Sequence, residues 1–138
     1  MNLGEIITYA FHAIKRLKDG DLKAKGELVD LFRNNDFQCS GCEIQLVSLL
    51  DKPECIDDVL DIIDAYYLGG HHLGGWEVTY VGSLLTNSDP GVTSRVAKII
   101  SQTFEMGHYY GSLTMQLYEM KKAGVQIATD LWEKYVKH

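Results

Sequence analysis

The stretch Ser83-Leu84-Leu85-Thr86-Asn87-Ser88-Asp89-Pro90-Gly91-Val92 decides the fold of this chain. Its second half is rich in turn-forming residues, and Asp89 followed by Pro90 is a typical cap and first-turn pair at the start of a helix. We therefore expect a helix from this point to about Met106. Its apolar residues Val96, Ile99 and Ile100 follow helical spacing and are expected to face the core.

The apolar residues of that helix follow a short pattern: one apolar residue, two of any type, then two adjacent apolar residues. Four copies occur, and they read Leu28-Leu31-Phe32, Val59-Ile62-Ile63, Val96-Ile99-Ile100 and Ala128-Leu131-Trp132. The intervals between them are 31, 37 and 32 residues. The tripeptide Ser-Leu-Leu also recurs, at residues 48–50 and 83–85. Self-similarity at this period is typical of repeat proteins, in which each repeat is one small structural unit.

Helical periodicity extends over most of the chain. The expected helices cover about residues 6–17, 21–34, 40–51, 53–68, 76–85, 89–106, 108–122 and 123–137. Residues 76–85 are also compatible with a strand, and the repeat register favours a helix. The apolar stripes of the first three expected helices predict that Phe11, Leu22 and Ile44 face the core. The sequence predicts one all-α domain over residues 1–138, with about eight antiparallel helices in four pairs; the alternative is an irregular helical bundle.

The segment 83–92 resembles the turn between the two helices of a HEAT repeat. Residues 48–54 form a looser copy, and the repeat register covers about residues 14–132. The period here averages roughly 33 residues, which is shorter than the ~40–47 residues of HEAT and armadillo units. The resemblance implies an α-solenoid whose stacked helix pairs present an extended surface for a binding partner.

Composition limits the kinds of partner. The chain has 46% hydrophobic and 23% charged residues, its apolar runs are too short to cross a membrane, and its N-terminus lacks a basic targeting segment. These features favour a cytoplasmic protein, which we expect to be a monomer. The net charge of −6 disfavours direct binding to nucleic acid or to anionic lipid. A basic protein partner is expected instead.

The clearest chemical feature is an acidic row on the fourth expected helix. Its members share one helical side and are Glu54, Asp57, Asp58, Asp61 and Asp64. No Lys or Arg stands four residues after any of them, so the row is expected to be unpaired and to weaken its own helix. A solvated surface is one interpretation. The other is a partner-binding face on the second helix of a solenoid pair.

A glycine- and histidine-rich segment, residues 69–75, follows the acidic row. It is either a linker or a loop that joins the binding surface, and His71, His72 and Trp76 are candidate contacts. In the adjacent tyrosine pairs, Tyr67 and Tyr110 are the expected exposed anchors.

The cysteines offer an alternative zinc site. Cys39-x-x-Cys42 has the spacing of a zinc ligand pair, and Cys55 with His71 and His72 would complete a site. A second tight ligand pair is missing, so we expect free thiols and no metal or cofactor.

These features favour a non-catalytic protein-binding module. A small acidic chain of this kind resembles, as a class, the bacterial immunity proteins that neutralise secreted nuclease toxins. The resemblance implies that Asp57, Asp58, Asp61 and Asp64 imitate phosphates and occlude a basic cleft. A metal-dependent hydrolase using His71, His72 and His108 is one alternative, and a peptide-binding adaptor is another.

Overall fold

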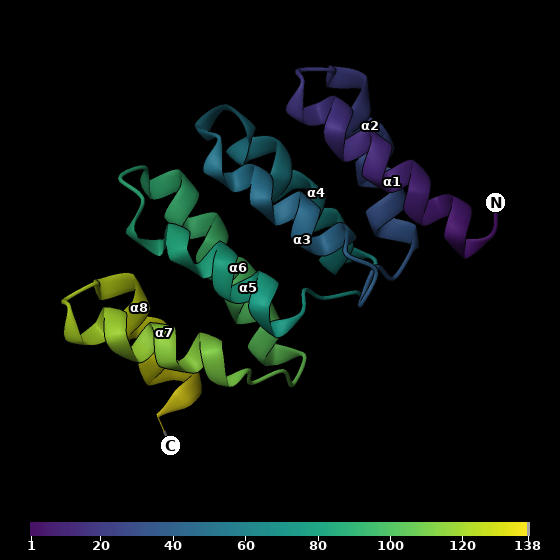
Figure 1. Cartoon of the computed structure of the whole chain (residues 1–138). Helices are drawn as coiled ribbons and strands as arrows, with labels where there is room; N and C mark the ends of the chain where they lie inside the picture. Colours follow the sequence, from purple (N-terminus) through teal and green to yellow (C-terminus); the bar gives the residue numbers. More distant parts are fainter. Residues whose placement is uncertain (138) are drawn as a thin grey trace. The chain divides into compact units, whose positions relative to one another are not determined.

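The computed structural model describes residues 1–137 and is all-α, with no strand in that range (Figure 1). Its helices are α1 Leu3–Lys18, α2 Leu22–Asn34, α3 Cys42–Ser48, α4 Ile56–Leu68, α5 Gly75–Gly82, α6 Pro90–Glu105, α7 Gly111–Lys122 and α8 Gln126–Leu131. Short 3₁₀ turns are η1 Leu49–Asp51, η2 Pro53–Cys55 and η3 Ser83–Thr86, and a π-helical turn, η4, covers Trp132–Val136. The predicted all-α class is confirmed, and residues 76–85 are helical.

Backbone contacts divide the chain into two compact units, an N-terminal unit of residues 1–72 and a C-terminal unit that begins at Leu73. In the N-terminal unit α1 packs against α2 and α3, and α2 packs against α4. In the C-terminal unit α5 packs against α6 and α7, and α8 packs against α6 and α7. Each unit is thus two stacked helical hairpins, with first helix against first helix and second against second. The single domain and the HEAT-like solenoid stay predictions.

The repeated apolar pattern lies on the second helix of every hairpin. Its copies fall on α2, α4, α6 and the junction of α8 with η4. All of its residues are buried except Leu31 and Trp132, which are half-buried. The two Ser-Leu-Leu tripeptides also occupy equivalent places, because the first spans the end of α3 and the start of η1, and the second begins η3 at the end of α5. The repeat register read from the sequence is therefore the register of the hairpins.

The capping residues at two helix starts form the hydrogen bonds that the sequence predicts. The Asp89 carboxylate accepts a hydrogen bond from the Gly91 N–H at 2.8 Å, and Pro90 begins α6. The Asp21 carboxylate accepts from the Lys23 N–H at 3.0 Å and caps α2. These bonds satisfy N–H groups that a helix start leaves without partners.

Two expected helix starts are wrong. α7 begins at Gly111 and α8 at Gln126, a few residues later than expected. Gly107 and Gly124 adopt positive φ angles just after the preceding helices, and extended residues follow before the next helix can start. Positive φ is a conformation that glycine adopts at little cost, so both glycines act as helix stops.

The expected burial of three apolar residues is also wrong, because Phe11, Leu22 and Ile44 are all exposed. Leu22 opens α2, where no neighbouring helix covers it, and it is 77% exposed. In α3 the buried neighbour of Ile44 is the charged residue Glu43. The other members of the predicted stripes are better covered, and Ala10, Ile14 and Leu17 of α1 and Leu28 and Phe32 of α2 are all buried.

The core of the N-terminal unit is built around aromatic rings. The ring centroid of Phe32 lies 4.4 Å from that of Phe37 and 5.2 Å from that of Tyr66, and all three side chains are fully buried. Within residues 1–137, no helix is both long enough and apolar enough to cross a membrane.

Candidate functional site

The acidic row follows one side of η2 and α4. Pro53 begins η2, and Asp57 and Asp58 occupy the first turn of α4, where the positive end of the helix dipole favours carboxylates. The opposite side of α4 is buried, and its fully buried residues include Val59 and Ile63. The five acids share the less buried side of η2 and α4, although one carboxylate oxygen of Asp64 is itself buried.

The row is not unpaired, which corrects the sequence-based expectation. Lys25 on α2 places its Nζ 3.1 Å from Asp58 Oδ1 and 2.6 Å from Asp61 Oδ2. The hydrogen bonds to Asp61 and then Asp58 raise the pKa of Lys25 above its ordinary value, against a smaller opposing effect of burial. The partner comes from another helix, and a search for pairs four residues apart within one helix cannot find it.

The members of the row differ in how much of them solvent reaches. Glu54 and Asp57 are exposed, whereas Asp58, Asp61 and Asp64 are half-buried. Asp51, just before the row in η1, is exposed as well. We call Asp51, Glu54 and Asp57 the acidic edge, because they lie three residues apart on successive turns and are the acids here most open to a partner.

The histidine segment belongs to the N-terminal unit up to His72. The His71 ring stacks on Tyr66 with centroids 5.1 Å apart, and the His72 carbonyl accepts a hydrogen bond from the Gln38 side chain at 2.5 Å. Gly69 passes so close to α2 that a Cβ there would overlap the carbonyl oxygen of Arg33. Both histidines are half-buried and are held against the unit.

The two tyrosines chosen as exposed anchors are not the exposed ones. Tyr67 is only 7% exposed, because α4 is covered over a face wide enough to bury both adjacent tyrosines. Tyr110 is half-buried against Gly75, and its neighbour Tyr109 is the exposed member at 56%. Trp76 is 57% exposed, as a surface contact requires, and its ring stacks on Tyr80. Trp76 and Tyr110 lie in the C-terminal unit.

The cysteines add no candidate metal-binding or reactive site to this surface. All three cysteines are free thiols; Cys39 is exposed, and burial raises the pKa of the Cys42 and Cys55 thiols. Across the described part of the chain, no three His, Cys, Asp or Glu side chains converge in a way that could hold a metal ion.

Sequence reasoning missed one buried polar cluster. The Tyr66 hydroxyl donates to Glu43 Oε2 at 2.6 Å and accepts from the Phe37 N–H at 2.9 Å. Burial, and then the hydrogen bond to Glu43, raise the pKa of Tyr66 above its ordinary value. The cluster joins α3, α4 and the chain between α2 and α3, so its role is to hold the N-terminal unit together.

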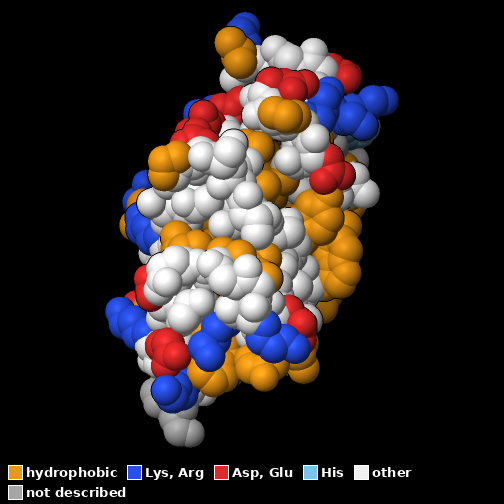
Figure 2. Space-filling model, turned by 90° about the vertical axis from the view of Figure 1, so that its left-hand side faces the viewer, with side chains coloured by type: hydrophobic (Ala, Val, Ile, Leu, Met, Phe, Trp, Pro, Cys, Tyr) orange, Lys and Arg blue, Asp and Glu red, His pale blue; other side chains and the backbone are white. Residues whose placement is uncertain are grey.

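The two units differ in charge. The N-terminal unit has thirteen Asp and Glu against seven Lys and Arg, whereas the C-terminal unit has six of each. On the face in Figure 2, acidic (red) and basic (blue) side chains both lie over the N-terminal unit, and basic side chains lie beside hydrophobic ones toward the C-terminal end. Within the C-terminal unit, Lys121 Nζ lies 4.8 Å from the Trp132 ring centroid. Comparison with protein-family models, curated proteins and solved structures finds no match to this chain.

Proposed function

We propose that this protein is a non-catalytic binding module for a basic protein, acting as an inhibitor in the manner of small acidic immunity proteins. One observation carries the proposal: the entire excess of negative charge lies in the N-terminal unit. A one-sided charge distribution attracts an oppositely charged partner from a distance and orients it before contact. A toxin or nuclease with a Lys- and Arg-lined cleft is the kind of partner that such a surface suits.

The acidic edge is the proposed contact surface. Asp51, Glu54 and Asp57 are exposed, and the adjoining Asp58 and Asp61 are bound to Lys25. The exposed acids of the edge are proposed to meet the partner, and the bonds of Asp58 and Asp61 to Lys25 hold α4 against α2. A basic cleft that closed over this edge would be occluded without any chemical step.

The cellular setting is part of the same proposal. Three free thiols, two of them buried, suit a reducing compartment, and we propose the cytoplasm. An inhibitor there would protect the cell that makes it, and a monomer would suffice for one-to-one occlusion.

The test compares two charge reversals of equal size. Glu54→Lys with Asp57→Lys reverses two of the three charges of the acidic edge. Asp19→Lys with Asp30→Lys reverses two exposed acids elsewhere in the same unit, and neither side chain makes a hydrogen bond or ion pair within residues 1–137. Wild type and both variants are immobilised at equal density and exposed to lysate of the native cell. Captured proteins are identified by mass spectrometry, and circular dichroism checks that the variants fold.

The expected result is one basic protein that wild type and the Asp19/Asp30 variant capture and the acidic-edge variant loses. For the purified partner, the edge reversal should slow association by at least about tenfold at low salt, and wild type should block the partner's activity at a one-to-one ratio. Equal capture by both variants, or an acidic partner, would refute the proposed surface. Several weak partners would support the adaptor alternative instead.

A further inference from the structure

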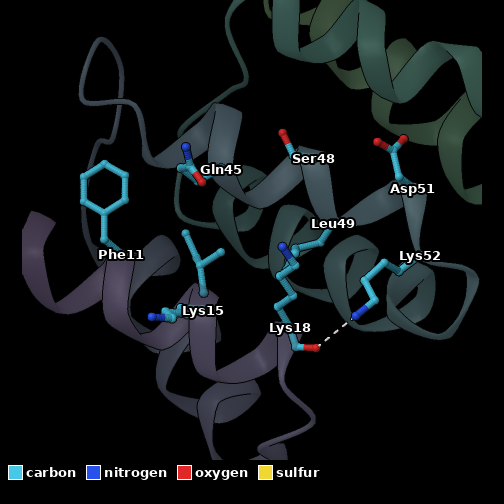
Figure 3. A pocket seen from close by; sticks show the side chains of 9 residues that line it. Phe11, Lys15, Lys18, Gln45, Ser48, Leu49, Asp51 and Lys52 are labelled. Atoms are coloured by element: carbon cyan, nitrogen blue, oxygen red, sulfur yellow. Dashed lines mark hydrogen bonds between the residues drawn. The ribbon is translucent and has the colours of Figure 1, made fainter.

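A groove of about 590 Å³ lies between α1 and α3 in the N-terminal unit (Figure 3). Phe11, Ile14 and Leu49 give it apolar walls. Lys15 and Lys18 enter from α1, and Lys52 enters from the turn before η2. Gln45 and Ser48 of α3 line the remaining side. Its volume is within the range of about 300–1,000 Å³ that is typical of small-molecule sites.

The charge of this groove is opposite to the charge of its unit. Three lysines and a single carboxylate, that of Asp51, line it, although acids outnumber bases almost two to one in the unit. No carboxylate of residues 1–137 pairs with Lys15 or Lys18. Unpaired ammonium groups beside a recess with apolar walls create a local positive potential, because the field is focused where water is partly excluded.

Lys52 is held at one end of the groove. Its Nζ donates a hydrogen bond at 3.3 Å to the carbonyl oxygen of Lys18, which ends α1, as the dashed line in Figure 3 marks. Glu54 Oε1 is 3.9 Å from the same nitrogen. Lys52 therefore joins the η1–η2 turn to the end of α1, and it keeps a third positive charge beside Lys18.

A helix-dipole effect explains only part of this arrangement. Basic residues in the last turn stabilise a helix, and Lys15, Arg16 and Lys18 all occupy the last turn of α1. That effect requires neither a recess nor a third lysine from another element. It also does not account for the exposed ring of Phe11 beside the ammonium groups.

We propose that this groove binds a small organic anion that has an apolar body and carries a carboxylate, sulfonate or phosphate. The apolar walls receive the body, Lys15 and Lys18 receive the charge, and the Gln45 amide supplies a further donor and acceptor. This site adjoins the acidic edge, because Asp51 lines the groove and Glu54 Oε1 lies 3.9 Å from Lys52 Nζ, but it selects ligands of the opposite charge. Substitutions at Lys15 and Lys18 leave the acids of the edge unchanged, so loss of anion binding can be told apart from loss of protein binding.

The experiment uses two fluorescent probes of similar shape. The first is 8-anilinonaphthalene-1-sulfonate, an aromatic anion, and the second is N-phenyl-1-naphthylamine, which lacks the sulfonate. Each is titrated into the 138-residue chain at low salt. The test variant is Lys15→Gln with Lys18→Gln. The matched control is Lys23→Gln with Arg33→Gln, which removes two exposed charges on α2 outside the groove.

The wild-type protein should bind the sulfonate more tightly than the uncharged probe. The test variant should weaken sulfonate binding roughly five- to tenfold, since each partly exposed pair contributes a modest amount. The control should change sulfonate binding by less than about twofold, because its charges lie outside the groove. Phe11→Ala should weaken both probes, since the apolar wall serves both.

The proposal is overturned if the test variant binds the sulfonate as wild type does, or if the control variant loses as much affinity. It is also overturned if the uncharged probe binds as tightly as the anion. Amide chemical shifts from two-dimensional NMR give an independent readout. Addition of the sulfonate should move the signals of Gln45 and Ser48, and shifts confined to other residues would likewise reject the groove.

Discussion

The two units share one backbone plan and differ in the interactions that they add to it. In each, two hairpins stack, and the repeated apolar pattern lies on the second helices. In the N-terminal unit, ion pairs join helices: Arg16 pairs with Glu27, and Lys25 with Asp58. In the C-terminal unit, Lys122 lies over the ring of Tyr118, and Lys121 lies over that of Trp132 with its Nζ 3.9 Å from Glu133 Oε1.

This difference shows that the repeated apolar pattern and the charged side chains have different roles. The apolar pattern builds a hairpin stack in both units, so it carries no information about which unit binds a partner. The acidic excess and the lysine-lined groove both belong to the N-terminal unit. Candidate functions therefore follow the charged side chains that are laid over a common scaffold.

The largest expected effect on stability comes from the aromatic residues that end two copies of the apolar pattern. Phe32 and Trp132 end the first and fourth copies, yet Phe32 is fully buried against two rings and Trp132 is half-buried. Phe32→Ala should lower the free energy of unfolding by about 3–5 kcal/mol because it leaves a cavity. Trp132→Ala should lower it by about 1–2 kcal/mol. Urea unfolding followed by far-ultraviolet circular dichroism measures both.

The milder substitution Phe32→Leu is the control, and it should fall between wild type and Phe32→Ala because it removes less volume. Equal losses for Phe32→Ala and Trp132→Ala would contradict the comparison. They would mean that the two ends of the chain depend equally on their copies of the pattern.

Alanine substitutions at two glycines of the N-terminal unit should change the stability of the protein in opposite directions. A Cβ at Gly69 would overlap the backbone of Arg33, so Gly69→Ala must push α4 away from the end of α2. We expect a loss of about 2–3 kcal/mol in stability. Gly26 lies within α2 with open space around it, and Gly26→Ala should stabilise the protein by about 0.5–1 kcal/mol. Thermal unfolding measures both, and shifts of the same sign would contradict the packing of α4 on α2.

Much of the fold could be predicted because its signals are local. Asp89 with Pro90 starts α6 through bonds within three residues, and the helical stripe of each second helix needs only its own sequence. The late starts of α7 and α8 were missed although their cause is local too. Gly107 and Gly124 stop one helix, and nothing in their identity says how many extended residues follow.

The site was predicted less well because its decisive contacts join distant residues. Lys25 is more than thirty positions from Asp58 and Asp61, so no helical spacing rule relates them. The buried carboxylate of Glu43 accepts a hydrogen bond from Tyr66, which lies on another helix. The sequence indicates which side of α4 is acidic, and tertiary packing decides which of those acids already have a partner.

The smallest expected effect on stability concerns the pairing of Lys25 with Asp58 and Asp61, which corrects the sequence-based prediction of an unpaired row. Lys25→Gln removes the bridge from α2 to Asp58 and Asp61. The pair is partly exposed, so the loss at pH 7 should be below about 1 kcal/mol. The pKa of Lys25 is raised above 10.5 in the folded protein, so its stabilisation is fully present below pH 10.5 and is lost as pH rises through the folded value.

Urea unfolding of wild type and Lys25→Gln from pH 7 to pH 11.5 checks this dependence, with Lys23→Gln as an exposed control on the same helix. The difference between wild type and Lys25→Gln should shrink at the alkaline end and in about 1 M salt, which screens exposed charges. Lys23→Gln should show no such difference. If Lys25→Gln were as stable as wild type at every pH, the contact of Lys25 with Asp58 and Asp61 would contribute nothing to the packing of α2 on α4.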